Sequence, residues 1–286
     1  MPGCSSLVFG TAQLGSAYGI ANTSGRPTHA AALQLLATAK AAGVRAVDTA
    51  PSYGEAETII GSAGVDLPVF TKVGPADDPE QSLQGSLMRL QRASVDILFF
   101  HDAASALAGD RRSVDAATAL VGSLVSRLGI STYTVEEFRE ALSDGRFGAI
   151  QAPVSVADRR LVDSGLLERA AHEGIDVYAR SAFLQGALLM PAGTLPARLR
   201  DLEETRAVVV EAARTEGRSV AEVLAVFARD LPGVTAVVVG AETQAQLQAN
   251  IDALRAPPLS IDTSERLFAL APLSEVVLDP RAWSRP

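Results

Sequence analysis

Eight short apolar runs, each followed by a segment of helical periodicity, constrain the fold of this chain more than any other feature. The runs are rich in β-branched side chains and nearly free of polar ones, as buried parallel strands are. The expected strands are Leu7–Gly10, Ala46–Asp48, Val69–Lys72, Ile97–His101, Arg127–Ile130, Ala149–Gln151, Ile175–Arg180 and Val234–Val239. Strand ends from Asp48 to Arg180 lie roughly 20 to 30 residues apart, about one strand–helix unit. The sequence therefore predicts an α/β fold, a (β/α)8 TIM barrel, rather than an open sheet.

The segments between the runs carry helix start signals. Three of them begin with a capping box, in which a Ser or Thr is followed three residues later by Glu or Gln. These boxes are Thr134-x-x-Glu137, Ser219-x-x-Glu222 and Thr243-x-x-Gln246. Further helices are expected over His29–Ala42, from Pro79 after the N-cap Asp78, over Leu161–Glu173, around Asp201–Glu216 and over Thr263–Leu270. One helix or more thus follows most of the expected strands.

The chain of 286 residues has no internal repeat and no low-complexity linker. One barrel of about 250 residues is an ordinary size for this fold, so we expect a single domain spanning residues 1–286. Within it, residues 257–286 form a C-terminal helix and tail. The sequence leaves open whether this part caps the barrel, lines a pocket or frays.

Composition excludes several classes of function. The net charge is −8 and no run of Lys or Arg forms a basic stripe, so neither nucleic acid nor an anionic membrane is an expected partner. Cys4 is the single cysteine and the three histidines are far apart, which predicts no internal disulfide and no metal site. Without a leader sequence or a long apolar segment, the chain is expected to be cytoplasmic. The oligomeric state stays open.

Four polar residues follow three neighbouring strands of the expected barrel. They are Asp48, Tyr53, Lys72 and His101. Lys72 is conspicuous because only Lys40 and Lys72 among 25 cationic residues are lysines. Since active sites of such barrels lie at the carboxyl ends of the strands, these four side chains are the candidate catalytic group.

The chemistry of the four side chains suits proton transfer to a carbonyl oxygen. A free tyrosine has a pKa of about 10, and we expect the nearby lysine to lower the pKa of Tyr53. Asp48 would hold Lys72 charged and in place, and His101 would orient a substrate carbonyl. Such a site lacks only a hydride, which a nicotinamide can supply.

The sequence resembles the aldo-keto reductase superfamily over nearly its whole length. The resemblance rests on Gly10-Thr11-Ala12-Gln13-Leu14-Gly15, Asp48-Thr49-Ala50-x-x-Tyr53-Gly54-x-x-Glu57, Thr71-Lys72, Phe100-His101 and Gly240 followed by Asn250. It implies a TIM barrel with Tyr53 as general acid, tuned by Lys72 and Asp48, and with His101 orienting the carbonyl. It also implies NAD(P)H bound without a Rossmann motif, and no GxGxxG occurs here.

The resemblance extends to residues that would bind the cofactor. Ser131, Thr132 and Gln151 match positions that bind the nicotinamide amide, with Thr132 departing from the usual Asn. Arg180 stands where many members stack an aromatic ring on the nicotinamide, and a guanidinium plane can also stack. The residues after it match the pyrophosphate-side loop: Ser181, Phe183, Leu184 and Gly186.

The last segment matches the adenosine-phosphate motif through Gly240, Glu242, Gln246 and Asn250. Members that prefer NADPH usually carry a cation here, whereas Glu242 would repel a 2′-phosphate. Position three of a capping box explains Gln246 equally well. We expect NADPH as the cofactor, with NADH as the alternative.

The leading interpretation is an NAD(P)H-dependent oxidoreductase that reduces a small-molecule aldehyde or ketone to an alcohol. One alternative is a regulatory protein that holds the nucleotide as a redox sensor on a reductase scaffold. Another is a barrel isomerase or lyase that uses the same acid/base set without redox chemistry. Fold alone does not separate these classes.

Overall fold

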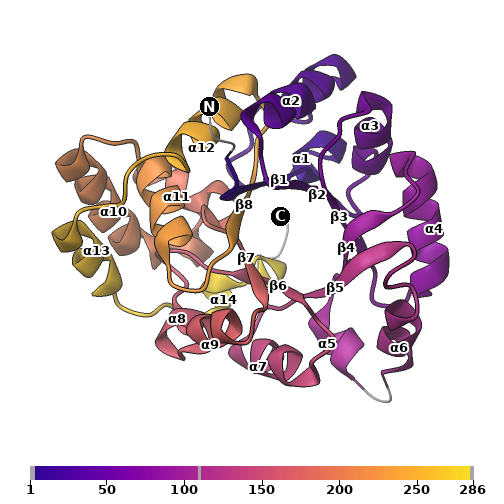
Figure 1. Cartoon of the computed structure of the whole chain (residues 1–286). Coiled ribbons are helices and arrows are strands. Elements are labelled where there is room, and N and C mark those ends of the chain that lie inside the picture. The colour runs from indigo at the N-terminus through magenta and orange to yellow at the C-terminus, as the bar shows by residue number, and fades with distance from the viewer. Residues whose placement is uncertain (1–3, 109–110, 284–286) are drawn as a thin grey trace.

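Eight parallel strands form a closed barrel, which confirms the expected fold class. The computed structural model describes residues 4–108 and 111–283. Each strand pairs with the next, and β8 returns to β1 through Val237 beside Leu7. The strands are β1 Leu7–Gly10, β2 Ala46–Asp48, β3 Val69–Val73, β4 Val95–Phe100, β5 Val125–Ser131, β6 Ala149–Pro153, β7 Asp176–Arg180 and β8 Ala236–Gly240. Helices surround this barrel (Figure 1).

Helices follow the strands in chain order. They are α1 Ala12–Gly15, α2 His29–Ala42, α3 Ala56–Ala63, α4 Pro79–Leu90, α5 Ala103–Leu107, α6 Arg112–Thr118, α7 Val135–Asp144, α8 Arg160–Asp163, α9 Leu166–His172, α10 Leu202–Glu216, α11 Val220–Asp230, α12 Gln244–Ala253, α13 Ile261–Phe268 and α14 Glu275–Leu278. Three 3-10 segments complete the set: η1 Leu184–Leu189, η2 Ala197–Leu199 and η3 Pro280–Ala282.

The expected helix caps are largely present. Both halves of the capping box form at Thr134 and at Thr243, while Ser219 accepts only from the Glu222 backbone N–H. Asp78 accepts from the Gln81 N–H at the start of α4. Each such bond satisfies a backbone donor that a helix N-terminus would otherwise leave unpaired.

The prediction of a single helix over Leu161–Glu173 is wrong. The segment forms two short helices, α8 and α9, on either side of Gly165, whose φ of 68° is left-handed. Apolar residues on both sides, Leu161 and Leu166, are buried in the same core, which is why their spacing looked continuous. Gly165 ends one helix because glycine adopts the left-handed region without steric cost.

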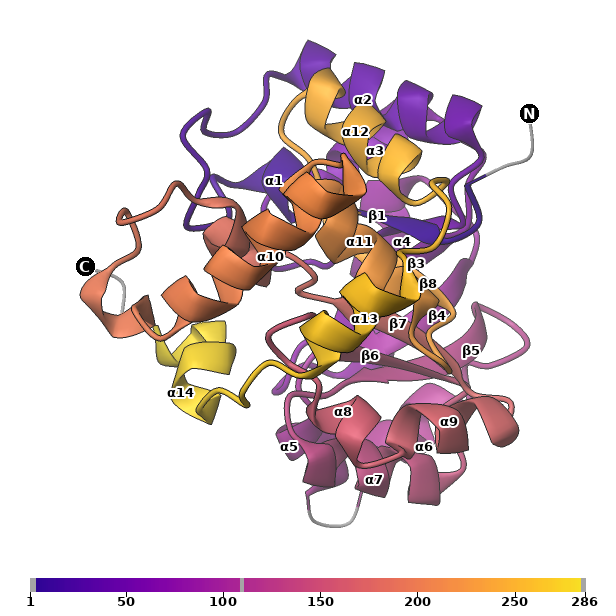
Figure 2. The same ribbon diagram turned by 90° about the vertical axis from the view of Figure 1, so that its left-hand side faces the viewer.

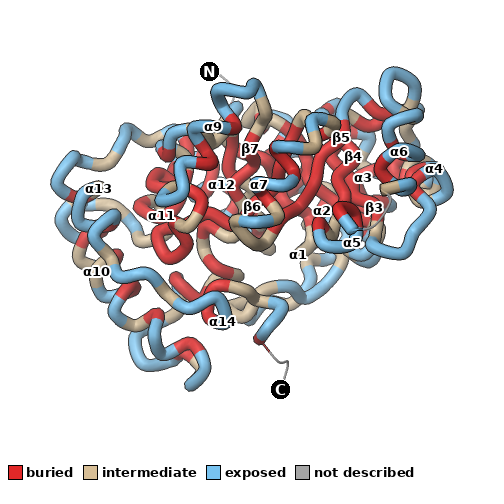
Figure 3. Tube along the Cα trace, turned by 90° about the horizontal axis from the view of Figure 1, so that it is seen from below, coloured by how far each residue is buried: buried red, intermediate tan, exposed pale blue. Residues whose placement is uncertain are grey.

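The apolar core has two parts, one inside the barrel and one between the strands and the surrounding helices. The interior is filled by Val8, Ala46, Phe70, Ile97, Phe99, Ala149, Tyr178 and Ala236. A larger core lies between the strands and the helices, and Figure 3 shows the buried strands within a largely exposed outer shell. Gly129 on β5 leaves room for the Phe99 ring in the barrel interior, because a Cβ at this position would lie 2.5 Å from ring atoms of Phe99.

The C-terminal segment packs along the barrel and then crosses to one of its ends. α13 contacts α10, and α14 leads to η3, where Pro280 and Arg281 line the cavity described below. The Trp283 indole N–H donates to the Val277 carbonyl oxygen at 3.2 Å and fixes this turn. In Figure 2, α14 lies on the same side of the barrel as the chain that follows β1.

Two negative observations concern the described residues alone. No helix among them combines the length and apolar character that a bilayer span requires. Nor do their His, Cys, Asp and Glu side chains gather in threes at a geometry that would hold a metal ion.

Candidate active site

The period of the β-strand brings the candidate residues to one level of the barrel. Side chains two residues apart on a strand share a face, and five of the candidates follow an interior residue by two positions. The interior residues Ala46, Phe70, Phe99, Ala149 and Tyr178 are thus followed by Asp48, Lys72, His101, Gln151 and Arg180. These five, together with Tyr53, line one cavity of about 500 Å³ at the carboxyl ends of the strands.

A buried ion pair lies at the floor of the cavity. Lys72 Nζ donates to both carboxylate oxygens of Asp48, at 2.7 Å each, and to the Thr49 carbonyl oxygen at 2.9 Å. Lys72 and Asp48 are 2% and 3% exposed, so water screens neither charge. Burial lowers the pKa of Lys72, and the adjacent Asp48 carboxylate opposes that fall. The pair behaves as one fixed unit because all three ammonium protons have acceptors.

A second buried carboxylate supports the ion pair from behind. Glu57 on α3 is 1% exposed; it accepts from the Thr71 hydroxyl at 2.6 Å and from Arg89 Nε at 2.7 Å. Thr71 directly precedes Lys72 on β3, and the Glu57 charge acts to raise the pKa of Lys72. Glu57 therefore links the strand that carries Lys72 to α4, which carries Arg89.

Tyr53 lies over this ion pair, but its pKa moves in the opposite direction from the expected one. Burial raises the pKa of Tyr53, the Asp48 charge raises it further, and Arg180 opposes the rise. Lys72 Nζ is 5.0 Å from the Tyr53 ring centroid and directs its protons to Asp48 and Thr49. The expected net lowering of the Tyr53 pKa is therefore wrong: burial and the Asp48 charge raise it, and the hydroxyl is protonated at neutral pH.

His101 stands edge-on to Tyr53, with ring centroids 5.9 Å apart and an interplanar angle of 82°. Burial lowers the pKa of His101 from 6.5 to about 3, and the charges of Lys72 and Arg180 contribute to this. Ser52 Oγ lies 3.5 Å from His101 Nδ1. The imidazole is therefore neutral at physiological pH and can hydrogen-bond a carbonyl oxygen without adding charge.

The residues expected to bind the nicotinamide amide do not all face the cavity. Ser131 and Gln151 line it, and Gln151 Nε2 donates to Asp48 Oδ1 at 2.5 Å. Thr132 is fully buried, and its hydroxyl is 3.5 Å from the Gln151 carbonyl oxygen, away from the cavity lining. Thr132 therefore does not line the cavity, and its expected contact with the nicotinamide amide stays a prediction.

Arg180 lines the cavity and is held by three contacts. Its guanidinium carbon lies 3.9 Å from the centroid of the Tyr133 ring, Nη2 donates to the Thr132 carbonyl oxygen at 2.8 Å, and Nη1 lies 3.4 Å from Ser181 Oγ. The Arg281 guanidinium contacts the same ring at 3.5 Å. Two guanidinium groups this close to the Tyr133 ring centroid would clash on one face of the ring, so the ring lies between Arg180 on one face and Arg281 on the other.

The loop after β7 adopts an unusual backbone next to the cavity. Positive φ values occur at Ser181 (63°), Leu184 (48°), Gln185 (52°) and Gly186 (89°). Such conformations cost about 1–3 kcal/mol each outside glycine and cluster at functional sites. Ser181, Phe183 and Gly186 line the cavity, whereas Leu184 is buried.

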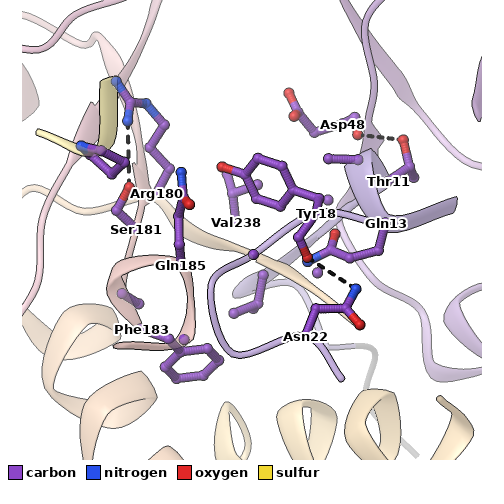
Figure 4. Close-up of a pocket in the computed structure, with 18 of the residues that line it drawn as sticks. Thr11, Gln13, Tyr18, Asn22, Asp48, Arg180, Ser181, Phe183, Gln185 and Val238 are labelled. Carbon is purple, nitrogen blue, oxygen red and sulfur yellow. Dashed lines mark hydrogen bonds between the residues drawn. The ribbon is translucent and has the colours of Figure 1, made fainter. Parts of the chain in front are cut away.

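The same loop meets the chain that follows β1. The Ile20 N–H donates to the Gln185 carbonyl oxygen at 3.1 Å. Figure 4 shows Tyr18 extending between the side of Asp48 and Thr11 and the side of Gln185 and Arg180. The two segments therefore close part of the rim over the cavity.

The expected adenosine-phosphate residues line the same cavity. These are Gly240, Glu242, Gln246 and Asn250. Gln246 Oε1 accepts from the backbone N–H groups of Glu242 and Thr243, at 2.8 and 3.1 Å, and Asn250 Nδ2 donates to the Gly240 carbonyl oxygen at 3.2 Å. Gln246 and Asn250 thus also shape the start of α12.

Several lining residues were not among the expected site residues. Thr11, Gln13, Tyr18 and Asn22 follow β1, and Tyr133 follows β5. Their position in the sequence could have identified them, because all of them follow the carboxyl end of a strand closely, as the expected residues do. Thr11 donates through its hydroxyl to the Asp48 carbonyl oxygen at 2.9 Å, which ties β1 to β2 (Figure 4).

One cavity therefore connects an acid/base group to the N-terminus of α12. A long ligand with a reactive group at one end fits this arrangement, and helix N-termini attract anions. The lining, which includes Tyr53, His101, Glu242 and Gln246, suits an extended dinucleotide.

Comparison with known proteins gives a consistent result. The sequence profile of the Aldo/keto reductase family matches residues 6–271. Among solved structures, an aldo-keto reductase from Bacillus halodurans in its holo form is 22% identical, with a TM-score of 0.76 over 96% of this chain and 95% of that one. An aldo-keto reductase from Klebsiella pneumoniae in complex with NADPH is 22% identical, with a TM-score of 0.71 over 96% and 94%. A thermostable aldo-keto reductase in complex with the inhibitor epalrestat is 25% identical, with a TM-score of 0.70 over 93% and 94%. A sequence search of curated proteins gives no significant match.

Proposed function

This chain belongs to the Aldo/keto reductase family, and from that premise we propose that it reduces an aldehyde or ketone with NADPH, using Tyr53 as the general acid. The observation that carries the proposal is the cluster of Tyr53, His101 and the Lys72–Asp48 pair at one end of the cavity. The substrate is a small-molecule carbonyl compound, and the product is the corresponding alcohol.

Each residue of the cluster has a role that follows from its charge state. Tyr53, with its raised pKa, is protonated and donates its proton to the carbonyl oxygen as negative charge develops there. His101 is neutral and orients the carbonyl by a hydrogen bond. The charged Lys72, fixed by Asp48, stabilises the phenolate left on Tyr53 from 5.0 Å below its ring.

The cofactor, when bound, supplies hydride to the carbonyl carbon. Ser131, Gln151 and Arg180 are the residues that would surround the nicotinamide, and Ser181, Phe183 and Gly186 would hold the pyrophosphate side. Gly240, Glu242, Gln246 and Asn250 would contact the adenosine end. Thr132 is left out of this set because it lies outside the cavity lining.

The choice of NADPH is supported by relatives. Reductases from Klebsiella pneumoniae are described in complex with NADP and with NADPH. NADH is the alternative because Glu242 places a carboxylate near the expected 2′-phosphate. A calorimetric titration with both reduced nucleotides measures this preference.

Replacement of Tyr53 by Phe tests the role of the general acid. The variant keeps the ring that packs beside His101 and loses only the hydroxyl, so fold and nucleotide binding should persist. General acid catalysis contributes about 10²–10⁴-fold, so turnover of a panel of aldehydes, followed by loss of reduced-nicotinamide absorbance, should fall by about that factor. A Tyr53→Phe variant as active as the parent would remove the basis for this assignment.

A further inference from the structure

Arg180 holds its charge in a fixed position at the wall of the cavity. Its guanidinium is stacked against the Tyr133 ring at 3.9 Å and bonded to the Thr132 carbonyl oxygen at 2.8 Å. The Nε atom is buried and has no hydrogen-bond partner among the described residues. A planar group held on one face by an aromatic ring keeps its orientation better than a flexible ammonium would.

Arg180 differs in its charge balance from the other cationic side chains that line the cavity. Lys72 is paired with Asp48 at 2.7 Å, and Arg281 is paired with Asp279 at 2.8 Å. Arg180 makes no ion pair with any carboxylate of residues 4–108 and 111–283, and its bonded oxygens are those of neutral groups. It therefore brings to the cavity a positive charge that no carboxylate contacts directly, although Asp279 lies close enough for Arg180 to lower its pKa.

This charge acts on the catalytic cluster. Burial is the main cause of the lowered pKa of His101, and Arg180 lowers it further. Arg180 likewise opposes the burial-driven rise of the Tyr53 pKa. Any ring that delivers hydride to a carbonyl held by Tyr53 and His101 has to lie in the same section of the cavity, and so within the field of Arg180.

We propose that Arg180 makes this cavity bind the reduced nicotinamide cofactor more tightly than the oxidised one. The inference rests on the proposed function. The nicotinamide ring is neutral when reduced and positively charged after it has given up hydride. Arg180 is half-buried, and a cofactor that fills the cavity displaces the water around it, so the fixed cation disfavours the charged form. An aromatic side chain at this position would favour that form instead, through a cation–π contact.

The consequence is directional. The reduced cofactor is retained until it reacts, and the oxidised cofactor is held less tightly, which promotes its release. Arg180 thereby biases the enzyme toward carbonyl reduction over alcohol oxidation. No change of backbone structure is needed, since the charge of the ring is the only quantity that changes between the two bound states.

The test is the ratio of dissociation constants for NADP⁺ and NADPH, measured by calorimetry in the absence of substrate. In the parent protein NADPH should bind about tenfold more tightly or better, where tenfold corresponds to about 1.4 kcal/mol. Arg180→Gln and Arg180→Met, which remove the charge, should each reduce this ratio about tenfold. Arg180→Lys, which keeps the charge, should largely preserve it.

The double variant Arg281→Gln with Asp279→Asn is the matched control, since it removes a cation that stacks on the same ring together with the carboxylate that pairs with it. It should leave the ratio within about twofold of the parent. An unchanged ratio in both neutral Arg180 variants, confirmed as folded by thermal melting, overturns the inference while the proposed function stands. Equal loss of the ratio in the Arg281→Gln, Asp279→Asn double variant also overturns it. If the parent binds neither nucleotide, the inference and the proposed function are both overturned.

Discussion

Replacing Asp48 by Asn exposes how strongly the active site depends on one buried charge. The substitution preserves shape and removes the carboxylate that compensates Lys72. In the parent, the Lys72 ammonium donates to two carboxylate oxygens at 2.7 Å and to the Thr49 carbonyl oxygen at 2.9 Å. In the variant it keeps the Thr49 carbonyl oxygen, and one neutral amide oxygen replaces the two charged acceptors. Because Lys72 is 2% exposed, water does not replace what is lost.

The expected cost follows from the burial of both partners. Breaking a buried ion pair by removing one partner costs about 3–5 kcal/mol, because the other charge stays buried without compensation. The double variant Asp48→Asn with Lys72→Met removes both charges and should lose clearly less than the single variant. The two substitutions should therefore be strongly non-additive, with a coupling energy of about 1–3 kcal/mol. Asp66→Asn, at an exposed position, is the control and should change stability by less than about 0.5 kcal/mol.

The pH dependence provides an independent check. The folded-state pKa of Lys72 lies below its ordinary 10.5, and the loss of Asp48 lowers it further. Above the lowered pKa the folded protein has released a proton that the unfolded chain still binds, so stability rises with pH up to about 10.5. The deficit of Asp48→Asn relative to the parent should thus be largest near neutral pH and shrink as the pH rises.

The assay is urea unfolding of the parent, the two single variants, the double variant and the control, at neutral pH and at about pH 9–10. If Asp48→Asn loses no more than the double variant at neutral pH, an unpaired charge is not the cause of the loss. A deficit that does not change with pH would contradict the titration of Lys72. Either result would refute the reasoning.

Three further predictions concern other parts of the molecule. Since the pKa of His101 falls from 6.5 to about 3, the folded state resists a protonation that the unfolded chain accepts, and acidification across that window should destabilise the parent more than His101→Gln in thermal melts. Gly129→Ala should lose about 1–3 kcal/mol in urea unfolding by overpacking against Phe99, whereas Gly85→Ala within α4 should gain about 0.5–1 kcal/mol; equal effects would contradict the packing argument. Glu242→Arg should tighten NADPH binding while leaving NADH nearly unchanged, and an equal change for both nucleotides would show that residue 242 does not contact the 2′-phosphate.

The sequence was sufficient to predict the barrel because burial on both strand faces leaves a simple signature. All eight expected strands are present, with ends that differ by two residues or fewer. The prediction of a single helix over Leu161–Glu173 was wrong because the spacing of apolar residues indicates which side chains are buried and does not show that the backbone is continuous. The left-handed conformation of Gly165 is a local feature of the backbone, and the periodicity of apolar residues does not predict it.

The site was predictable in position and less so in its internal bonding. The alternation of strand side chains suffices to place Asp48, Lys72 and His101 at one level. It does not say that Lys72 directs its protons to Asp48, nor that burial and the Asp48 charge raise the pKa of Tyr53. Those outcomes depend on distances and solvent exclusion, which arise from the packing of the whole barrel. The side chain of Gln151 bonds to Asp48 for the same reason.

The bond between Gln151 and Asp48 joins strands that are far apart in the barrel order. β2 and β6 are four places apart in a ring of eight, so they belong to different half-barrels, β1–β4 and β5–β8. The first half carries Asp48, Tyr53, Lys72 and His101, and the residues assigned to the cofactor come from the second. Separated fragments would each hold an incomplete site, and the Gln151–Asp48 bond would re-form only when the two half-barrels dock in register. Docking of the halves and assembly of the active site are therefore the same event.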